Sequence, residues 1–429
     1  MLIQFSVNNF RSFSDSKILS MESTSISDYP ENISSNQKIK LNLCATIYGA
    51  NASGKSNLIQ AIGAMKSIIF NSFDRSSTDK ISYDPFLLNI DKLNQPSSFE
   101  IVFLVDDIQY RYGFKFDDKV IKEEWLFFAK KTKEHPLFYR IDDGIEVFKH
   151  FKEGINLESK TRENTLFLAV VDQFNGETSK IIMDWFNKLN VIDGVTHNDY
   201  RGITFKMLED EKTRNSLTKY YQKIGLGFDD IKIEKESFDP NLMSGIPEDL
   251  LKQMMADLEG SNIISMTTLH KMFNNDRELV DPVAEFDVRR QESSGTNKII
   301  DLSGPIFHTL KNGGIIIIDE LDAKLHPLLT VSIIRLFQNE DTNPHSAQLI
   351  FATHNTNILS LGRLRRDQIY FCEKDKYGMT DLFSLVEYNM KGKKIRKDNS
   401  FEKDYINGKY GAIPFIGNIE NLEVKWQEK

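Results

Sequence analysis

The sequence has little of what marks secreted, membrane-spanning or disulfide-stabilised proteins. It contains only 2 cysteines, Cys44 and Cys372, and each lies in an apolar run that is typical of a buried strand. A disulfide framework or a cysteine-bound metal is therefore not expected. No apolar run approaches the ~20 residues that a membrane-spanning helix needs, and the first residues, MLIQFSVNNF, lack the basic and apolar regions of a signal peptide. We therefore predict a cytoplasmic protein without a membrane partner.

Charge, periodicity and chain length further limit the possible partners and folds. The formal net charge is -8, so the composition does not require a large nucleic-acid-binding surface, although the basic run KGKKIRK at residues 391–397 leaves nucleic-acid binding open. No sustained heptad pattern is present, which argues against a long coiled coil. A chain of 429 residues is too long for one simple core, and we expect at least two lobes.

Two α/β halves are predicted to flank a middle region of different character. Strands are predicted as a hairpin over residues 2–21, a buried strand at 41–49, an antiparallel meander over 98–140, strand-leaning segments at 228–237 and 260–273, and buried strands at 313–320 and 347–354. Helices are predicted at residues 56–70, 179–192, 210–225, 245–260 and 327–338. The expected domains are residues 1–177, 178–284 and 285–429, and the middle one is expected to be a mostly helical insert lobe.

The segment GANASGKS, residues 49–56, matches the phosphate-binding pattern G-x-x-x-x-G-K-[ST] in full. It follows a predicted strand and opens a predicted helix, which is the context that this loop requires. Gly49 and Gly54 allow the backbone to turn around phosphate oxygens, and Lys55 supplies a positive charge for the β- and γ-phosphates. The Ser56 hydroxyl is a ligand for Mg²⁺. An ordinary glycine-containing turn with a capping serine does not explain the whole pattern in this context.

Acidic residues follow the buried apolar strand IIII at residues 315–318. Asp319 lies where a phosphate-binding loop needs a second group that orders Mg²⁺, and Glu320 is the candidate general base that polarises the attacking water. His354 ends the strand AQLIFATH and is expected to hydrogen-bond the γ-phosphate. Each of these residues alone also fits a structural role, and the phosphate-binding loop makes the catalytic interpretation the stronger one.

The order of the motifs GANASGKS, ESSGT, IIIIDE, LDAKLHP and ATH resembles that of ABC-type ATPases of the SMC/RecF sort, as do GKSN and NNFRSF. The segments ESSGTNK, DELDAKLHP, FATHNTNIL, RRDQIYF and YINGKYGAIP are more narrowly similar to RloA-like ATPases of bacterial abortive-infection operons, which act against phage. The resemblance covers roughly residues 1–171 and 285–415. It implies an α/β fold, a P-loop NTPase of ABC type with an antiparallel β subdomain, and ATP and Mg²⁺ as cofactors.

In that family two copies bind head to tail, and a signature motif in one copy closes on the ATP of the other. The resemblance therefore implies that Ser293, Ser294 and Gly295 contact the γ-phosphate in trans, with Lys298 adding positive charge. The leading Leu of the usual LSGGQ-like signature is replaced here by Glu292. An acid at this place needs a cation partner or must point away from the phosphate.

The resemblance also implies contacts outside these motifs. Asp322 matches the D-loop position that touches the opposite copy, whereas His326 is expected only to pack at a helix start. Arg11 matches a basic residue that related ATPases aim at the nucleotide, although a solvated turn arginine explains it equally well. The glutamine that usually helps to bind Mg²⁺ is not located, because Gln109 lacks the usual surroundings. The remaining nucleotide contacts implied are Asn51, Ser53 and Asn57.

Four functions compete at this stage. The first is an ATP-driven switch, in which a nucleotide-dependent homodimer or higher oligomer controls a separate effector, a nuclease or toxin, in anti-phage defence. Related nucleases carry a TOPRIM domain that needs an Asp-x-Asp pair, and no such pair occurs in this sequence, so the effector is expected to be another polypeptide. The second is a RecF-like ATPase that binds DNA ends, for which KGKKIRK is the best support. A nucleotide-gated binding module is disfavoured by Glu320, and a transporter ATPase by the meander and insert that separate the phosphate-binding loop from the signature.

Overall fold

A computed structural model describes residues 1–34, 39–141, 144–196, 200–237, 262–390, 393–394 and 400–414. The chain forms two compact units. The first consists of Met1–Val195, Thr309–Ala323 and Thr330–Lys429, and the second of Thr196–His308 and Lys324–Leu329. The first unit therefore joins the two ends of the chain, and the second holds most of the middle.

A six-stranded sheet forms the centre of the first unit. In spatial order its strands are β16 (Thr380–Ser384), β15 (Ile369–Lys374), β3 (Cys44–Tyr48), β14 (Gln348–Ala352), β13 (Ile315–Asp319) and β9 (Leu189–Asp193). All neighbours run parallel except β15 and β16. Strands β3, β14 and β13 are buried almost throughout, which explains why their sequences are continuous apolar runs. The buried strands predicted from those runs are confirmed.

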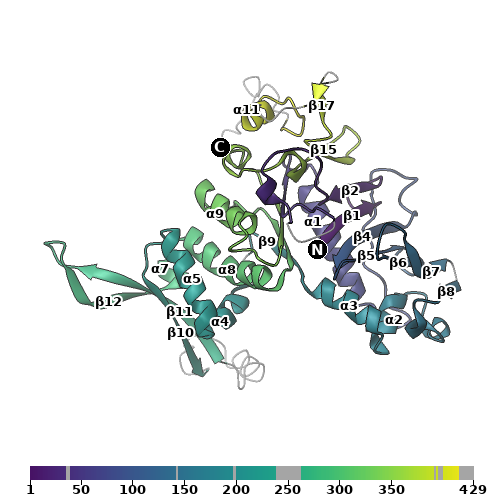
Figure 1. Cartoon of the computed structure of the whole chain (residues 1–429), viewed down its shortest axis with the longest axis horizontal. Coiled ribbons are helices and arrows are strands. Elements are labelled where there is room, and N and C mark those ends of the chain that lie inside the picture. The colour runs from purple at the N-terminus through teal and green to yellow at the C-terminus, as the bar shows by residue number, and fades with distance from the viewer. Residues whose placement is uncertain are drawn as a thin grey trace, which may run out of the picture. The chain divides into compact units, whose positions relative to one another are not determined.

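A seven-stranded antiparallel sheet is the second sheet of this unit (Figure 1). Its strands, in spatial order, are β2 (Lys17–Ser20), β1 (Leu2–Asn8), β4 (Ser97–Val105), β5 (Ile108–Phe116), β6 (Ile121–Ala129), β7 (His135–Ile141) and β8 (Gly144–Val147). Alternate residues of β4, such as Phe99, Ile101 and Phe103, are buried on one face. The predicted N-terminal hairpin and antiparallel meander are therefore confirmed.

Helix α1 (Lys55–Phe70) belongs to one core with both sheets. Its apolar residues Leu58, Ile62, Met65 and Ile69 recur at helical spacing and are buried. Helices α2 (Phe167–Gln173) and α3 (Glu177–Asn187) add side chains to the same core. Burial of each such side chain contributes about 1.5–3 kcal/mol, so the helix that follows the phosphate-binding loop is held firmly by both sheets.

Short elements complete the part of the chain that follows β13. They are α9 (Pro327–Gln338), α10 (Asn357–Leu361), α11 (Phe401–Ile406) and the strand pair β17 (Asn389–Met390) and β18 (Lys393–Lys394). Short 3-10 turns occur both before and after β13, at Pro30–Asn32, Lys152–Gly154, Glu158–Lys160 and Arg366–Gln368. Among the helices that the structure describes, none is both long enough and apolar enough for a membrane crossing.

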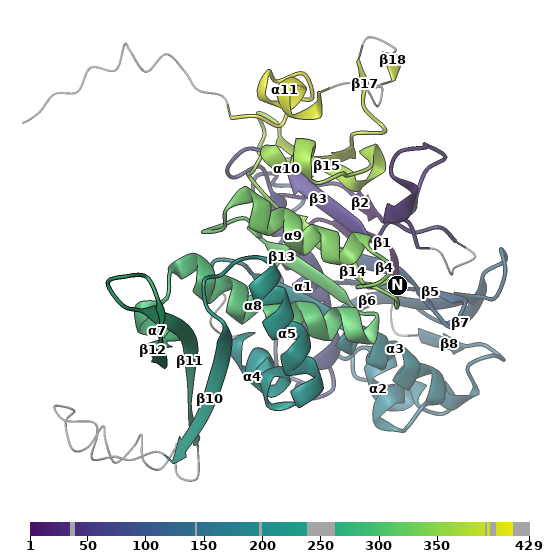
Figure 2. The same cartoon turned by 60° about the vertical axis from the view of Figure 1, so that its left-hand side comes forward.

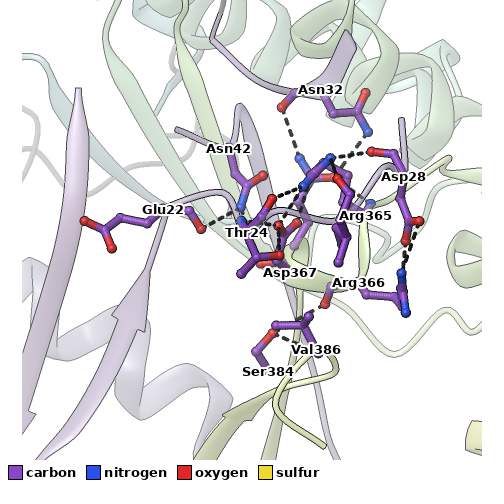
Figure 3. A network of polar contacts seen from close by, with 12 residues as sticks. Glu22, Thr24, Asp28, Asn32, Asn42, Arg365, Arg366, Asp367, Ser384 and Val386 are labelled. Carbon is purple, nitrogen blue, oxygen red and sulfur yellow. Dashed lines mark hydrogen bonds and ion pairs between the residues drawn. The ribbon is translucent and has the colours of Figure 1, made fainter. Parts of the chain in front are cut away.

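A fully buried arginine fastens the segment after β2 to the start of β15 (Figure 3). The Arg365 guanidinium donates hydrogen bonds to three backbone carbonyls between residues 24 and 28, and to both carboxylate oxygens of Asp367. Asp367 in turn accepts hydrogen bonds from the backbone N–H and the hydroxyl of Thr24, at 2.7 and 2.8 Å. The RRDQIYF motif therefore contains a structural cross-link between distant parts of the chain.

The second unit combines helices with a three-stranded antiparallel sheet (Figure 2). The strands are β10 (Asp230–Ser237), β11 (Asn262–Phe273) and β12 (Leu279–Asp287), with β11 in the middle. The helices are α4 (Arg201–Glu209), α5 (Glu211–Lys223), α7 (Val288–Gln291) and the larger part of α8 (Ser294–Asn312). The insert was expected to be mostly helical, and the sheet makes its described residues a mixture of helix and strand.

One predicted helix is wrong in its last part. Helix α3 ends at Asn187, and the next residues form β9 instead of continuing the predicted helix to residue 192. Parallel pairing of β9 with β13 overrides the helical spacing of the apolar residues in this segment. The predicted helix at 245–260 lies outside the described residues. So does the basic run at 391–397, apart from the backbone of β18.

Candidate functional site

The loop of residues 49–56 connects β3 to α1. Gly54 is the N-cap of α1 and has a φ of 110°, which glycine adopts without strain. A Cβ atom at Gly54 would collide with the Thr380 side chain, and one at Gly49 would collide with the backbone carbonyl of Cys372. Strands β15 and β16 therefore lie so close to the loop that only glycine fits at these two positions.

Lys55 is the first residue of α1, and its side chain folds back into the loop. Its Nζ donates hydrogen bonds to the carbonyl oxygens of Gly49 at 2.8 Å and Ala50 at 2.9 Å. Burial lowers the pKa of the ammonium group, and the nearby carboxylates of Asp319 and Glu320 oppose this change. Lys55 thus places a positive charge inside the loop and within electrostatic range of the acids after β13.

Carboxylates gather at the carboxyl ends of β13 and β9. Asp319 ends β13 and lies in register with Asp193, the last residue of β9. Glu320 follows Asp319 with a φ of 49°, a left-handed conformation that is strained for glutamate. The Oδ1 atoms of Asp319 and Asp322 are buried and have no hydrogen-bond partner within the described parts of the chain.

These carboxylate oxygens fit a hard divalent cation. A buried carboxylate oxygen without a partner is costly, and Mg²⁺ prefers oxygen ligands from one or two carboxylates together with phosphate. The Ser56 hydroxyl supplies a further oxygen, because Ser56 is half-buried directly after Lys55 at the start of α1. Ser56 and Asp319 are therefore suited to hold Mg²⁺, as the sequence predicts.

His354 follows β14, the strand between β3 and β13. Partial burial of the ring and the positive charge of Lys55 lower the pKa of His354, whereas Asp322, Glu320 and Asp319 act to raise it. The imidazole is therefore mainly neutral near pH 7, with one nitrogen that donates and one that accepts. The structure thus brings the predicted catalytic residues Lys55, Glu320 and His354 into one electrostatic cluster.

Asn51, Ser53 and Asn57 differ in what they offer a ligand. Asn51 is exposed. The Ser53 hydroxyl is buried and has no hydrogen-bond partner among the residues that the structure describes, which suits it to a phosphate oxygen. Asn57 instead donates a hydrogen bond to the Ser12 hydroxyl at 2.7 Å. In this conformation Asn57 ties α1 to the turn after β1.

Arg11 lies in that turn, with a φ of 50°. Its guanidinium donates to the Gln60 side chain of α1 and to Asp84 Oδ2 at 3.3 Å. The Arg11 and Asp84 side chains are 39% and 50% exposed, so this ion pair contributes little to stability. Arg11 therefore stands at the surface beside α1, already paired.

The ESSGT segment opens α8 in the second unit. The Ser293 hydroxyl accepts a hydrogen bond from the backbone N–H of Thr296 at 3.1 Å and so satisfies one donor of the first turn. Ser294 is exposed beside it. A Cβ atom at Gly295 would lie 2.9 Å from the backbone oxygen of Lys324, so glycine fits best there. Lys298 is fully buried, which leaves the two serines as the accessible polar groups of this helix start.

Glu292, the residue that departs from the usual signature, faces β11. Its Oε1 accepts a hydrogen bond from the Thr268 hydroxyl at 2.5 Å and lies 3.0 Å from His270 Nε2. The acid therefore has a hydrogen-bond donor and a potential cation as partners, which answers the question that the sequence raised.

Sequence reasoning missed two residues of this region, Asp193 next to Asp319 and Tyr405 next to the loop. Asp193 was hidden because β9 had been interpreted as the end of a helix. Tyr405 on α11 hydrogen-bonds through its hydroxyl with the backbone of Gly49, and burial raises the pKa of this phenol to about 12. Its ring lies 5.5 Å from that of Tyr48, at the end of β3. The segment YINGKYGAIP contains Tyr405, so the available signal was its position in a motif.

The chain is similar to a known protein family. A family model described as "AAA domain, putative AbiEii toxin, Type IV TA system" matches residues 44–360. The matched region begins at β3 and includes the phosphate-binding loop, the ESSGT segment, the acids after β13 and His354. No curated protein matches the chain. Since the match spans well over half of the 429 residues, the chain belongs to this AbiEii-like AAA family of P-loop ATPases.

Proposed function

We propose that this chain is an ABC-type ATPase whose nucleotide-dependent homodimer acts as a switch on a separate effector in bacterial defence against phage. One observation carries the hydrolytic part of the proposal. Lys55, Glu320, His354 and the buried carboxylate oxygens of Asp319 and Asp322 converge at one edge of a parallel sheet. Positioned charge around the γ-phosphate is what phosphoryl transfer requires.

Nucleotide binding begins with an exchange of hydrogen bonds at the loop. Lys55 leaves the carbonyl oxygens of Gly49 and Ala50 and binds oxygens of the β- and γ-phosphates. The loop backbone donates its N–H groups to the same phosphates. Ser56 and Asp319 would hold Mg²⁺, which would neutralise charge on the phosphate oxygens.

Hydrolysis then depends on Glu320 and His354. Glu320 accepts a proton from the water that attacks the γ-phosphate. The left-handed backbone conformation of Glu320 sets the direction of its side chain directly after the end of β13. The neutral His354 ring donates a hydrogen bond to a γ-phosphate oxygen, and this bond strengthens as charge develops there. Both side chains belong to the first unit.

The switch depends on the exposed start of α8. Ser293 and Ser294 lie at the N-terminus of a 19-residue helix, where spare backbone N–H groups favour an anion. In the proposed dimer this helix start binds the γ-phosphate held by the other copy. Because the γ-phosphate exists only before hydrolysis, the dimer is stable with ATP and dissociates after hydrolysis.

The effector is proposed to be another polypeptide, a toxin or nuclease. The description of the matched family, which names a putative toxin of a type IV toxin–antitoxin system, supports a setting of this kind. The narrower RloA-like assignment rests on the motifs quoted from the sequence. Purified protein that degrades DNA or RNA by itself would contradict a separate effector. Hydrolysis that DNA stimulates, with affinity that falls steeply with salt, would favour the RecF-like alternative.

Two variants test the hydrolytic switch. Glu320→Gln should bind ATP, lose at least ~100-fold in hydrolysis, and accumulate as an ATP-bound dimer in light scattering. Lys55→Ala should lose ATP binding. Glu146→Gln, an exposed residue of β8, is the matched control and should behave as wild type. Hydrolysis by Glu320→Gln at the wild-type rate would show that the general base lies elsewhere.

The trans arrangement has a separate test. Ser294→Arg should abolish hydrolysis on its own, because the arginine side chain blocks the helix start that receives the γ-phosphate. Mixed with Lys55→Ala, it should restore one of the two composite sites and so regain part of the activity. Wild-type activity of Ser294→Arg alone would rule out the trans contact.

A further inference from the structure

Glu292 directly precedes the turn of residues 293–295 and links this turn to the middle strand of the three-stranded sheet in the second unit. We propose that Glu292 is a positioning residue that couples this sheet to residues 293–295, and so sets how well they receive the γ-phosphate of a second copy. The inference rests on the trans arrangement of the proposed function and adds a means of regulating it.

The link is a compact group of buried polar atoms. Thr268 is fully buried, the Glu292 side chain is 9% exposed and the His270 side chain is 19% exposed. The Thr268 hydroxyl lies 2.5 Å from Glu292 Oε1 and 3.0 Å from His270 Nε2. The His270 ring is itself held against the Phe286 ring of β12, with centroids 4.3 Å apart. Hydrogen bonds to a carboxylate in such surroundings are stronger than neutral ones.

A second set of contacts holds the same turn through Asn297, a residue that follows the turn in the sequence. Asn297 Nδ2 donates to the carbonyl oxygens of Val288 at 2.7 Å, Glu292 at 3.3 Å and Ser293 at 3.1 Å. Arg201 Nη2 donates to Asn297 Oδ1 at 2.8 Å. These contacts fix the turn to α4 and α8, whereas Glu292 connects it to β11. A displacement of β11 would therefore reach Ser293 through the side chain of the residue directly before it.

The charge of Glu292 gives the link a functional consequence. A carboxylate that turned toward the exposed start of α8 would repel a phosphate group there. Bound to Thr268 and His270, the same carboxylate is held on β11. The engaged link thus favours the γ-phosphate, and a released link disfavours it.

The test compares two nearly isosteric variants, Thr268→Val and Glu292→Gln, with a matched control. Thr267→Val makes the same change on the same strand, at a half-buried position whose side chain points to the other face of the sheet. All are made in the Glu320→Gln background, so that hydrolysis does not dissolve the dimer. Sedimentation measures the ATP-dependent dimer, and a fluorescent ATP analogue at low protein concentration measures nucleotide binding by the monomer.

Thr268→Val should weaken the dimer about tenfold, because it releases the carboxylate toward the phosphate, whereas Glu292→Gln removes the charge and should leave the dimer intact. The double variant should dimerise like Glu292→Gln alone, because without the charge of Glu292 nothing repels the phosphate when the link is broken. Nucleotide binding by the monomer, and both properties of Thr267→Val, should be unchanged. An unaltered dimer in Thr268→Val, or a double variant as weak as Thr268→Val alone, would overturn the inference. A parallel loss of nucleotide binding by the monomer would overturn it as well, because the effect would then be a general loss of structure.

Ser294→Arg, measured alongside, separates this inference from the proposed function. If Ser294→Arg dimerises like its parent, the trans arrangement itself is wrong. If Ser294→Arg prevents the dimer while Thr268→Val leaves it intact, only the role of Glu292 is wrong.

Discussion

Arg201 is a buried cation whose removal should destabilise the second unit strongly. Its Nε and Nη2 bind the two carboxylate oxygens of Asp301 at 2.5 and 3.0 Å, and Nη2 also donates to Asn297. The side chains of Arg201 and Asp301 are 4% and 0% exposed. Arg201→Met fills similar space but leaves the Asp301 carboxylate buried without its guanidinium partner. Loss of one member of such a pair costs about 3–5 kcal/mol.

The assay is thermal unfolding at pH 7 without nucleotide. For a unit of this size the expected loss corresponds to a fall in Tm of roughly 10 °C or more. Arg214→Met is the matched control in the same unit. The Arg214–Asp230 ion pair is 2.9 Å long, but its side chains are 38% and 43% exposed. Its loss should therefore cost less than about 1 kcal/mol.

A double variant checks the physical reason. Arg201→Met combined with Asp301→Leu should recover most of the lost stability, because an apolar pair of similar volume replaces a buried ion pair at little net cost. Equal losses for Arg201→Met and Arg214→Met would refute the argument from burial. Failure of the double variant to recover would show that the geometry of the pair, and not an uncompensated charge, maintains this unit.

Three further predictions concern the first unit. Gly54→Ala should lower the free energy of unfolding by about 1–3 kcal/mol, because Gly54 has a positive φ and the Thr380 side chain of β16 lies beside it. Gly202→Ala is the control, since this helical glycine has open space around it, and it should be neutral or stabilising. Equal effects of the two changes in thermal unfolding would contradict the strain at Gly54. Asp319→Asn should bind ATP with an affinity that depends less on Mg²⁺ than that of the wild type, because Ser56 is then the remaining protein ligand. Calorimetry with and without Mg²⁺ would disprove this role of Asp319 if the dependence were unchanged. Partial burial and Lys55 lower the pKa of His354, so the folded protein binds this proton less tightly than the unfolded chain, and stability should fall as the pH drops below about 6.5. His354→Gln should remove this part of the pH dependence when unfolding is measured at several pH values. An unchanged profile would contradict the role of His354.

The sequence was most informative where local chemistry and long apolar runs coincide. Continuous apolar segments predicted the buried parallel strands, and the spacing of Gly49, Gly54, Lys55 and Ser56 predicted the loop that joins β3 to α1. These features are encoded within a few consecutive residues. The position of Asp319 at the end of its strand followed from the same pattern.

Features that depend on pairing between distant segments were harder to predict. Residues 189–193 continue the helical spacing of α3, and only their pairing with β13 makes them a strand. Asp193 became visible as a neighbour of Asp319 through that pairing alone. The partners of Glu292 lie on β11, more than 20 residues earlier in the chain, and no local pattern announces such a contact. Tyr405 likewise meets Gly49 across most of the chain.

The cross-link made by Arg365 limits what the motif RRDQIYF can indicate about function. A planar guanidinium that satisfies three backbone carbonyls and one carboxylate cannot be replaced by lysine, which has no rigid fork of donors. Selection on RRDQIYF would thus act through folding of the scaffold, whatever the protein senses or controls. Proteins found through this motif should share the way in which their N-terminal segment is tethered, and their biological targets must be sought in other parts of their chains.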